Sequence, residues 1–226
     1  MVQAKYFNKG TLRGIVSKSD LVEFNGKSGK SKFLAVEVNT DGVSNKIKAT
    51  VFPTNSNPDK ANELHEQYPV NSKVEVSGGI GEREYESNGR KGVDRSINAF
   101  SVRAKREDQK DGAFFIYQGD VTKIVETADG ANVTVKYVEE YENAKKEKVT
   151  KEEFVTLTAD HDGVELISDV DLIVGCNAKF KGQIFNKLEF DEYGDVVDNV
   201  QMYKIDKIED VLQPDEIESV EKPEWM

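Results

Sequence analysis

Two aromatic residues in the first half of the sequence stand among lysines, in segments that alternate between apolar and polar residues. If residues 33–38 and 46–52 are strands, their apolar residues share one inward face. The outward residues then include Phe33, Lys46, Lys48 and Phe52. Exposed rings stack on nucleic-acid bases for about 1–3 kcal/mol each, while cationic side chains follow the phosphates. The pattern predicts contact with a single-stranded nucleic acid, and packing of both rings under a loop or against another domain is the alternative.

Two connections beside these strands add cations and one further ring. Residues 25–32 are a glycine-rich connection with three lysines, and residues 82–95 are a second connection, in which three glutamates dilute the positive charge. The basic and aromatic candidates in the two connections are Lys27, Lys30, Lys32, Arg83, Tyr85, Arg90, Lys91 and Arg95. Both connections are predicted to flank a bound phosphate chain, and two solvated hairpin loops are the alternative.

Charge is divided unevenly along the chain. The 226 residues include 31 lysines and arginines against 42 acidic residues, which gives a net charge of −11. Residues 1–111 carry net +4, whereas residues 112–226 carry net −15. The first half therefore offers a surface for an anion, and the acidic segment 185–198 of the second half would repel phosphate. Two solvated surfaces of different charge are the alternative.

Three short segments of the first half recur in the same order in the second half. The matched segments are 10–16 with 119–125, 73–80 with 177–184, and 97–102 with 200–205, at offsets of 109, 104 and 103 residues. Between them, alternating segments predict two more strands in each half, 33–38 and 46–52, then 132–138 and 154–159. One short helix is predicted in each half, over 58–68 and 162–172, the first capped by Asn57.

Five short strands with one helix between the third and the fourth are the plan of the OB-fold, a small Greek-key barrel. The sequence therefore predicts an all-β protein with short helices, built from two tandem OB-fold domains over 1–108 and 112–207. The last residues, 208–226, contain seven acids and one lysine and are predicted to be a flexible acidic tail. Two unrelated β-barrels or sandwiches are the alternative.

Two such units followed by an acidic tail resemble the single-stranded-DNA-binding proteins of bacteriophages and replication systems, which include tandem OB-fold proteins akin to replication protein A. The resemblance implies sequence-tolerant binding of single-stranded DNA in DNA replication or recombination, in the cytoplasm of a bacterial or host cell, with RNA open as another ligand. It implies a first barrel that binds the strand and a second that is structural or protein-binding. The tail, with Trp225 and Met226 at its tip, would recruit replication or recombination proteins; a solubilising terminus is the alternative.

Other chemistry has little support in the residues. The segment 29–31 lacks the first glycine of a phosphate-binding loop, and His65, His161 and the single cysteine Cys176 lack the spacing of a zinc site. We predict no catalytic residue, no metal, no cofactor and no membrane-spanning segment, and therefore a protein that is not an enzyme. The competing hypotheses are a protein-interaction or virion-assembly module built from two β-barrels, and a nuclease or other enzyme on an OB-like scaffold.

Overall fold

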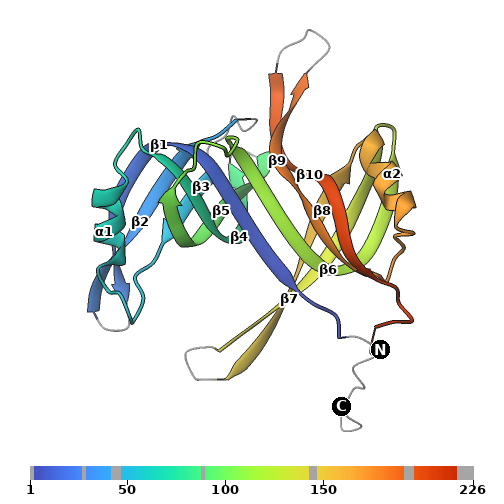
Figure 1. Ribbon diagram of the computed structural model, residues 1–226, viewed down its shortest axis with the longest axis horizontal. Coiled ribbons are helices and arrows are strands. Elements are labelled where there is room, and N and C mark those ends of the chain that lie inside the picture. The colour runs from blue at the N-terminus through green and yellow to red at the C-terminus, as the bar shows by residue number, and fades with distance from the viewer. Residues whose placement is uncertain are drawn as a thin grey trace. The chain divides into compact units, whose positions relative to one another are not determined.

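The computed structural model describes residues 3–26, 29–41, 47–87, 90–142, 147–190 and 196–217, and their strands and helices are labelled in Figure 1. The strands of the first half are β1 (Phe7–Gly26), β2 (Gly29–Asn39), β3 (Ile47–Val51), β4 (Lys73–Ser87) and β5 (Arg90–Ala104). Those of the second half are β6 (Gly112–Thr127), β7 (Gly130–Glu142), β8 (Lys148–Ala159), β9 (Asn177–Phe190) and β10 (Val196–Leu212). The helices are α1 (Lys60–Gln67) and α2 (His161–Asp169). The predicted all-β class with short helices is confirmed.

The strands of the first half close into a ring, which we call the first barrel. Strand β1 pairs antiparallel with both β2 and β4, β2 pairs with β3, and β4 pairs with β5. A parallel pairing of β3 with β5 completes the ring β1–β2–β3–β5–β4, with α1 between β3 and β4. Its core contains Leu12, Val36, Ala49, Val74 and Ile97, all buried. This order of strands is that of the OB-fold.

The second half repeats this order as β6–β7–β8–β10–β9, with β9 also pairing with β6, and we call it the second barrel. The pairing of β8 with β10 is parallel, as that of β3 with β5 is. Three tyrosines fill its interior, where the ring of Tyr117 lies 5.5 Å from that of Tyr203 and 5.8 Å from that of Tyr137. The expectation of one strand order in both halves is therefore confirmed.

The chain divides into two compact units whose boundaries differ from the predicted halves. One unit contains residues 9–115 together with 183–202, and the other contains 1–8, 116–182 and 203–226. The outer part of β9 and β10 thus belongs with the first barrel, where Arg95 Nη1 donates to the carbonyl oxygen of Gln201 at 2.5 Å. The predicted domain ranges 1–108 and 112–207 differ from these units, because they leave residues 183–202 with the second domain.

The residues before β1 form hydrogen bonds with the unit that contains the second barrel. The backbone N–H of Lys5 donates to Asn177 Oδ1 at 3.3 Å, and Asn177 Nδ2 donates back to the carbonyl oxygen of Lys5 at 3.1 Å. Tyr6 donates its hydroxyl to Asp120 at 2.9 Å. Burial, followed by this hydrogen bond, raises the pKa of Tyr6 to about 12. Residues before β1 are therefore anchored to the second unit and not to the first barrel that they precede.

The middle match of the internal repeat is confirmed by backbone geometry. Asn71 and Gly175, 104 residues apart, both have positive φ, of 76° and 97°. The N–H of Asn71 donates to Val16 O at 2.9 Å, and that of Gly175 donates to Val121 O at 2.8 Å. The offset of 104 is therefore the structural one for this segment.

The other two matches are wrong in register. Gly14 and Gly119 are equivalent, because a Cβ at Gly14 would lie 1.9 Å from Asn39 O and one at Gly119 would lie 2.1 Å from Lys136 O. Their offset is 105 and not 109. In the closing strands, Thr50 pairs with Asn98 and Thr158 pairs with Lys204. Since Thr50 and Thr158 occupy the same place in the two barrels, the offset of the closing strands is 106 and not 103.

The two helices lie close to their predicted positions but begin differently. Asp160 caps α2, where its Oδ1 accepts from the backbone N–H of Gly163 at 3.1 Å. Helix α1 begins after Asp59, which makes no side-chain capping bond, so the predicted Asn57 cap is wrong. Asn57 lies in the turn before the helix, where its Oδ1 accepts from the backbone N–H of Asp59 at 3.2 Å and its Nδ2 donates to Glu63 at 2.8 Å. No helix of the described residues is long and apolar enough to cross a membrane.

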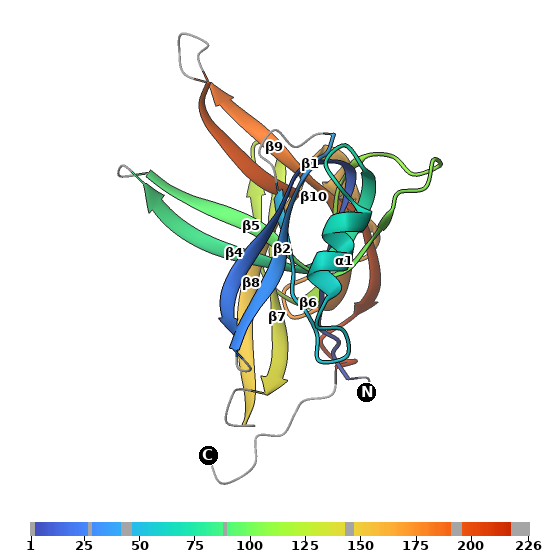
Figure 2. The same ribbon diagram turned by 90° about the vertical axis from the view of Figure 1, so that its left-hand side faces the viewer.

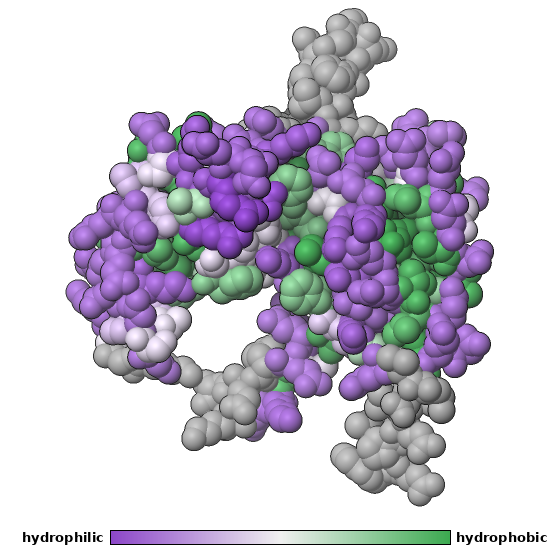
Figure 3. All heavy atoms as spheres, in the orientation of Figure 1, coloured by the Kyte–Doolittle hydropathy of each residue, from purple (hydrophilic) through white to green (hydrophobic). Residues whose placement is uncertain are grey.

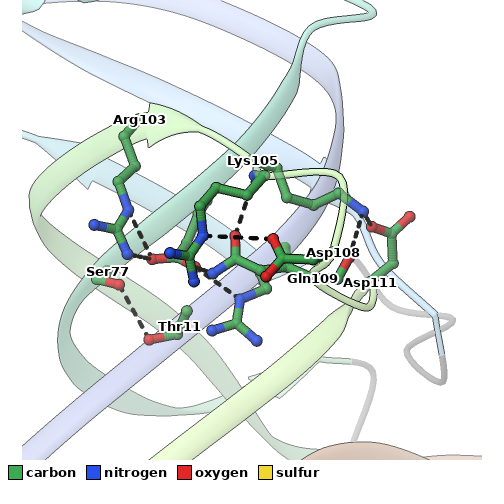
Figure 4. Close-up of polar contacts among 10 residues, drawn as sticks. Thr11, Ser77, Arg103, Lys105, Asp108, Gln109 and Asp111 are labelled. Atoms are coloured by element: carbon green, nitrogen blue, oxygen red, sulfur yellow. Dashed lines mark hydrogen bonds and ion pairs between the residues drawn. The ribbon is translucent and has the colours of Figure 1, made fainter.

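A buried carboxylate ties the connection after β5 to the first barrel (Figure 4). The side chain of Glu75 is 5% exposed and accepts from Arg13 at 2.7 Å and from Arg103 at 2.5 Å. Gln109, in the connection, donates to the same carboxylate at 2.9 Å. Burial raises the pKa of Glu75, but the hydrogen bonds from the two arginines outweigh it and hold the pKa below its usual value. Lys105 also pairs with Asp111, so residues 105–111 are held by side chains at both ends.

The last strand continues into the predicted tail. Strand β10 runs to Leu212, and Ile208 is only 8% exposed, so the predicted boundary at residue 208 is wrong by five residues. Glu209 accepts from Lys181 and Lys207, whose hydrogen bonds lower its pKa to about 2. Charged residues interrupt the alternation of apolar and polar residues in 200–212, and they form ion pairs on the surface of the strand. The end of the strand therefore has the acidic composition that predicted a tail. Residues beyond 217, including Trp225 and Met226, lie outside the described residues.

Candidate nucleic-acid interface

The outward side chains of β2, β3 and β5 form one continuous surface on the first barrel. Across the strands, Ala35 pairs with Thr50, and Thr50 pairs with Asn98. The next row is Glu37, Lys48 and Ser96. We call this surface, with the rings described below, the β2–β3 face; its residues are Phe24, Phe33, Ala35, Glu37, Lys48, Thr50, Phe52, Ser96 and Asn98. The strands that place these residues are β1, β2, β3 and β5, seen from the side of β1 and β2 in Figure 2.

Three phenylalanines gather at one end of the β2–β3 face. The ring centroids of Phe33 and Phe52 are 5.3 Å apart, and Phe24 lies 5.9 Å from Phe33 and 5.8 Å from Phe52. Phe52 remains 47% exposed and Phe33 is half-buried. Ring pairs at these distances stabilise one another by about 0.5–1.5 kcal/mol, which fixes the rings without removing them from solvent. The two predicted rings therefore pack on each other and still present aromatic surface.

The sequence interpretation missed Phe24. The opening strand was expected only around residues 10–16, but β1 continues to Gly26 as the long partner of β2. Phe24 pairs with Ser31 and therefore shares a face with Phe33, two residues further along β2. The alternation of Val22 and Phe24 toward the glycine at 26 was the signal that could have extended the strand.

Three predicted lysines, Lys30, Lys32 and Lys48, are exposed, and no ion pair that the structure describes involves any of them. Lys48 belongs to the β2–β3 face, whereas Lys30 and Lys32 alternate with Phe33 along β2 and lie on the opposite side of that strand. Glu37 stands across from Lys48 on β2 and is the one acidic residue of the β2–β3 face. Cations without a carboxylate partner can exchange their water for a phosphate at little cost, so the face is suited to a polyanion.

The remaining predicted residues cannot all be placed. Lys27 and Lys46 lie outside the described residues. The side chains of Arg83, Tyr85, Arg90 and Lys91 also lie outside them, although their strands are described: β4 and β5 pair as far as Ser87 and Arg90 and run on together as the long hairpin in Figure 2. Arg95, nearer the barrel, makes the contact with the Gln201 carbonyl described above.

Two glycines leave the outer surface of β4 without side chains next to the β2–β3 face. Gly79 pairs with Asn98 and Gly81 pairs with Ser96. A Cβ at Gly79 would meet nothing within 4 Å, and one at Gly81 would come no closer than 3.4 Å to Ser96. Gly78 differs, because a Cβ there would lie 2.1 Å from the carbonyl oxygen of Asn98. The register shift between Ser77 and Gly78 is a β-bulge, and it accounts for Gly78 but not for Gly79 or Gly81.

The corresponding surface of the second barrel has a different character. Lys136 lies 3.6 Å from both Asp120 and Glu152, and Lys204 lies 2.6 Å from Asp160. Thr156 stands at the place that Lys48 has in the first barrel. The exposed apolar residues of this unit include Val125, Phe154, Ile173 and Val174, and Figure 3 shows apolar surface on the part of this unit near α2. Lys136 and Lys204 on the second barrel already have carboxylate partners.

The described residues show no group of three or more histidine, cysteine, aspartate or glutamate side chains arranged to hold a metal ion. His65, which the sequence left without a role, contacts Ser19 through Nδ1 at 2.9 Å and so joins α1 to β1. Cys176 is buried and donates to Gln213. These residues serve the fold in the contacts that the structure describes.

Comparison with known proteins places the fold among single-stranded-DNA-binding proteins of known structure. No protein-family model matches the chain, and no curated protein matches it. The chain is similar to the crystal structure of the wild-type single-stranded DNA binding protein from Thermus aquaticus, with a TM-score of 0.55 and 15% identity over 91% of this chain and 93% of that one. A deletion mutant of the Thermus aquaticus protein gives a TM-score of 0.55 and 14% identity over 92% of this chain and 96% of that one. At this level of identity the likeness shows a shared fold.

Proposed function

We propose that this protein is a sequence-tolerant, non-enzymatic single-stranded-DNA-binding protein that acts in DNA replication or recombination. The observation that carries the proposal is the cluster of Phe24, Phe33 and Phe52 on the β2–β3 face, which also carries the exposed Lys48. A fold shared over most of the chain with a protein named for binding single-stranded DNA supports it. RNA is the alternative ligand, because base stacking and phosphate contacts are common to both single-stranded nucleic acids.

Binding on this face uses two kinds of contact. Bases stack on the exposed surface of Phe52 and its neighbours, while Lys48 contacts phosphates. The proposed site extends along the two hairpins through Lys27, Lys30, Lys32, Lys46, Arg83, Tyr85, Arg90, Lys91 and Arg95. Every base has a flat face to stack and every nucleotide has a phosphate, so the site tolerates any sequence.

The rest of the chain has other proposed roles. The second barrel is structural or protein-binding, because Lys136 and Lys204 on its surface are paired with carboxylates. The end of the chain, with Trp225 and Met226 at its tip, recruits replication or recombination proteins. An apolar tip among acidic residues suits a basic-rimmed apolar pocket on a partner.

A titration of the full-length protein against fluorescently labelled oligo-dT and a duplex of equal length tests the proposal. We expect tighter binding to oligo-dT, with log affinity falling against log salt at a slope of about −3 if four cations contact phosphates of a single strand. Equal or tighter binding to the duplex, or no dependence on salt, would contradict it. Absence of binding to either would favour the alternative of a protein-interaction or assembly module.

A further inference from the structure

Another phenylalanine of the first barrel, outside the aromatic cluster, is exposed. Phe100 in β5 is 60% exposed. It falls at a bulge, because Ser77 pairs with Ser101 and Gly78 pairs with Ala99, which leaves Phe100 without a partner on β4. Bulges re-aim side chains and are frequent beside functional sites. A single exposed ring is common on protein surfaces, so its surroundings decide its meaning.

Two lysines from different elements converge on Phe100. The ammonium group of Lys9, from β1, lies 6.0 Å from the centroid of the ring. The ammonium group of Lys60, at the start of α1, donates to the carbonyl oxygen of Phe100 at 3.1 Å, which leaves two of its three N–H donors available. Within the described part of the chain, neither lysine forms an ion pair with a carboxylate. One exposed ring thus lies beside two ammonium groups that no carboxylate neutralises.

We propose that Phe100, Lys9 and Lys60 form a second nucleotide-binding position on the first barrel, which stacks one base and contacts its flanking phosphates. The position rests on the proposed function and extends it. Phe100 follows Asn98 by two residues in β5, as Phe52 follows Thr50 by two residues, and Thr50 pairs with Asn98. Phe52 and Phe100 therefore lie at the same end of neighbouring strands, and a strand bound on the β2–β3 face can continue to Phe100.

The second barrel supplies a matched control. Phe154 is 58% exposed, almost the same as Phe100, and it also lies on an outward strand position. The cation across from it, Lys136, lies 3.6 Å from Asp120 and from Glu152. Phe154 therefore reproduces the exposed ring of Phe100 without cations free to contact phosphate.

The test uses full-length variants, labelled oligo-dT of about 16 nucleotides, the upper range for one OB-fold, and fluorescence anisotropy. We expect Phe100→Ala and Phe100→Leu to weaken binding about 5- to 150-fold, Phe100→Trp to retain it, and Phe154→Ala to leave it unchanged. The combined change of Lys9→Gln and Lys60→Gln should make the salt slope shallower by about 1.4, whereas Phe100→Ala should leave the slope unchanged.

Three outcomes separate the proposals. If Phe100→Ala binds as the wild type does, or Phe100→Leu binds as well as Phe100→Trp, the second nucleotide position is overturned, even where Phe33→Ala with Phe52→Ala still weakens binding. If wild-type protein binds oligo-dT no better than duplex, the proposed function fails first. Thermal unfolding of each variant checks the fold, and a loss confined to Phe100→Ala while Phe100→Leu and Phe100→Trp fold and bind normally would assign the ring to packing.

Discussion

The two barrels share one strand order yet carry different outer faces. On the first, the hairpin of β1 and β2 is paired as far as Gly26 and Gly29 and carries Phe24 and Phe33 on its outward side. On the second, the hairpin of β6 and β7 turns at Thr127 and Gly130, and Gly130 falls where the first barrel has Phe33. A longer hairpin is therefore what adds the aromatic cluster, and the barrel beneath it is unchanged. The proposed binding surface is therefore carried by a hairpin that extends from the barrel and not by the barrel itself.

The two barrels also differ in their ion pairs. By the offsets of 104 and 106, Glu75 and Arg103 of the first barrel correspond to Lys179 and Glu209 of the second. The charges are exchanged, and each pair joins the same two strands of its barrel: Arg103 lies 2.5 Å from Glu75, and Lys179 lies 3.7 Å from Glu209. The acid is buried in the first barrel and the base is partly exposed in the second.

The largest effect expected from this comparison is the loss of the aromatic surface. Changing Phe33→Ala together with Phe52→Ala should weaken binding of oligo-dT by about 2–6 kcal/mol, because each ring stacks one base and each also supports the other. Anisotropy titration measures the loss, with Phe154→Ala on the second barrel as the control. A double variant that folds normally and binds as tightly as the wild type would show that the rings are not the binding surface.

Loss of each of the two ion pairs should lower the free energy of unfolding by a different amount. Glu75→Gln should lower the free energy of unfolding by about 2 kcal/mol, below the 3–5 kcal/mol of a fully buried pair because Arg103 stays 64% exposed. Lys179→Gln should cost at most about 1 kcal/mol, since its pair is more exposed. Urea denaturation of both variants gives the comparison, and equal losses would contradict the distinction.

Glu75 also predicts an acid dependence for the first barrel. Its pKa in the folded protein lies below the ordinary value of 4.5, so its contribution to stability is fully present above that value. As pH falls through 4.5 and then through the lower folded pKa, the unfolded chain binds the proton first and the contribution is lost. Wild-type protein should therefore lose stability more steeply than Glu75→Gln below pH 4.5. Parallel curves in urea denaturation across this range would refute the assignment.

A smaller effect is expected when one face is given the residue of the other. Lys48→Thr copies the second barrel's Thr156 onto the β2–β3 face, and it should make the salt slope of oligo-dT binding shallower by about 0.7. Thr156→Lys, the reverse change, should leave the slope unchanged, because the second face lacks the rings. A steeper slope for Thr156→Lys would mean that both faces bind.

The smallest effect is expected at the end of the chain. Because Glu209 and Asp210 belong to β10, truncation after Ile217 removes three acids and one lysine, net −2, and leaves the barrel intact. Low-salt affinity for oligo-dT should rise only slightly, and the difference should vanish above about 0.3 M salt, where the Debye length is well below 10 Å. The change of Trp225→Ala with Met226→Ala should abolish partner recruitment without altering DNA affinity. A sharp fall in melting temperature on truncation would mean that these residues are structural.

Sequence reasoning reached the strand order because alternation and turn residues mark each strand. It mistook the register of the repeat because a shift of four residues preserves a period of two, so 10–16 matches 119–125 as well as the true partner does. The register of the closing strand was predicted wrongly because Met202 and Tyr203 are adjacent apolar residues, so alternation does not show which of them points inward. The register of the opening strands is fixed by Gly14 and Gly119, where a side chain would collide with a neighbouring carbonyl oxygen.

The candidate site was predicted in part for similar reasons. Phe33 and Phe52 stand at outward positions that alternation identifies within single strands. Phe24 was missed although the alternation of Val22 and Phe24 could have extended the strand. The cations around Phe100 depend on contacts between distant segments, such as Lys9 and Lys60 with β5, which no local pattern encodes. The exchange of residues 183–202 into the unit of the first barrel is likewise a long-range property.

Photo-crosslinking of the full-length protein to oligo-dT, followed by mass spectrometry of the linked peptides, tests the central claim most directly. Phe154 of the second barrel is at least as exposed as Phe52 of the first, so each barrel offers an exposed ring to the crosslinking chemistry. We expect crosslinks in the peptides that contain Phe24, Phe33 and Phe52, and none in the peptide that contains Phe154. Crosslinks concentrated on β6, β7 and β8 would contradict the assignment of DNA binding to the first barrel.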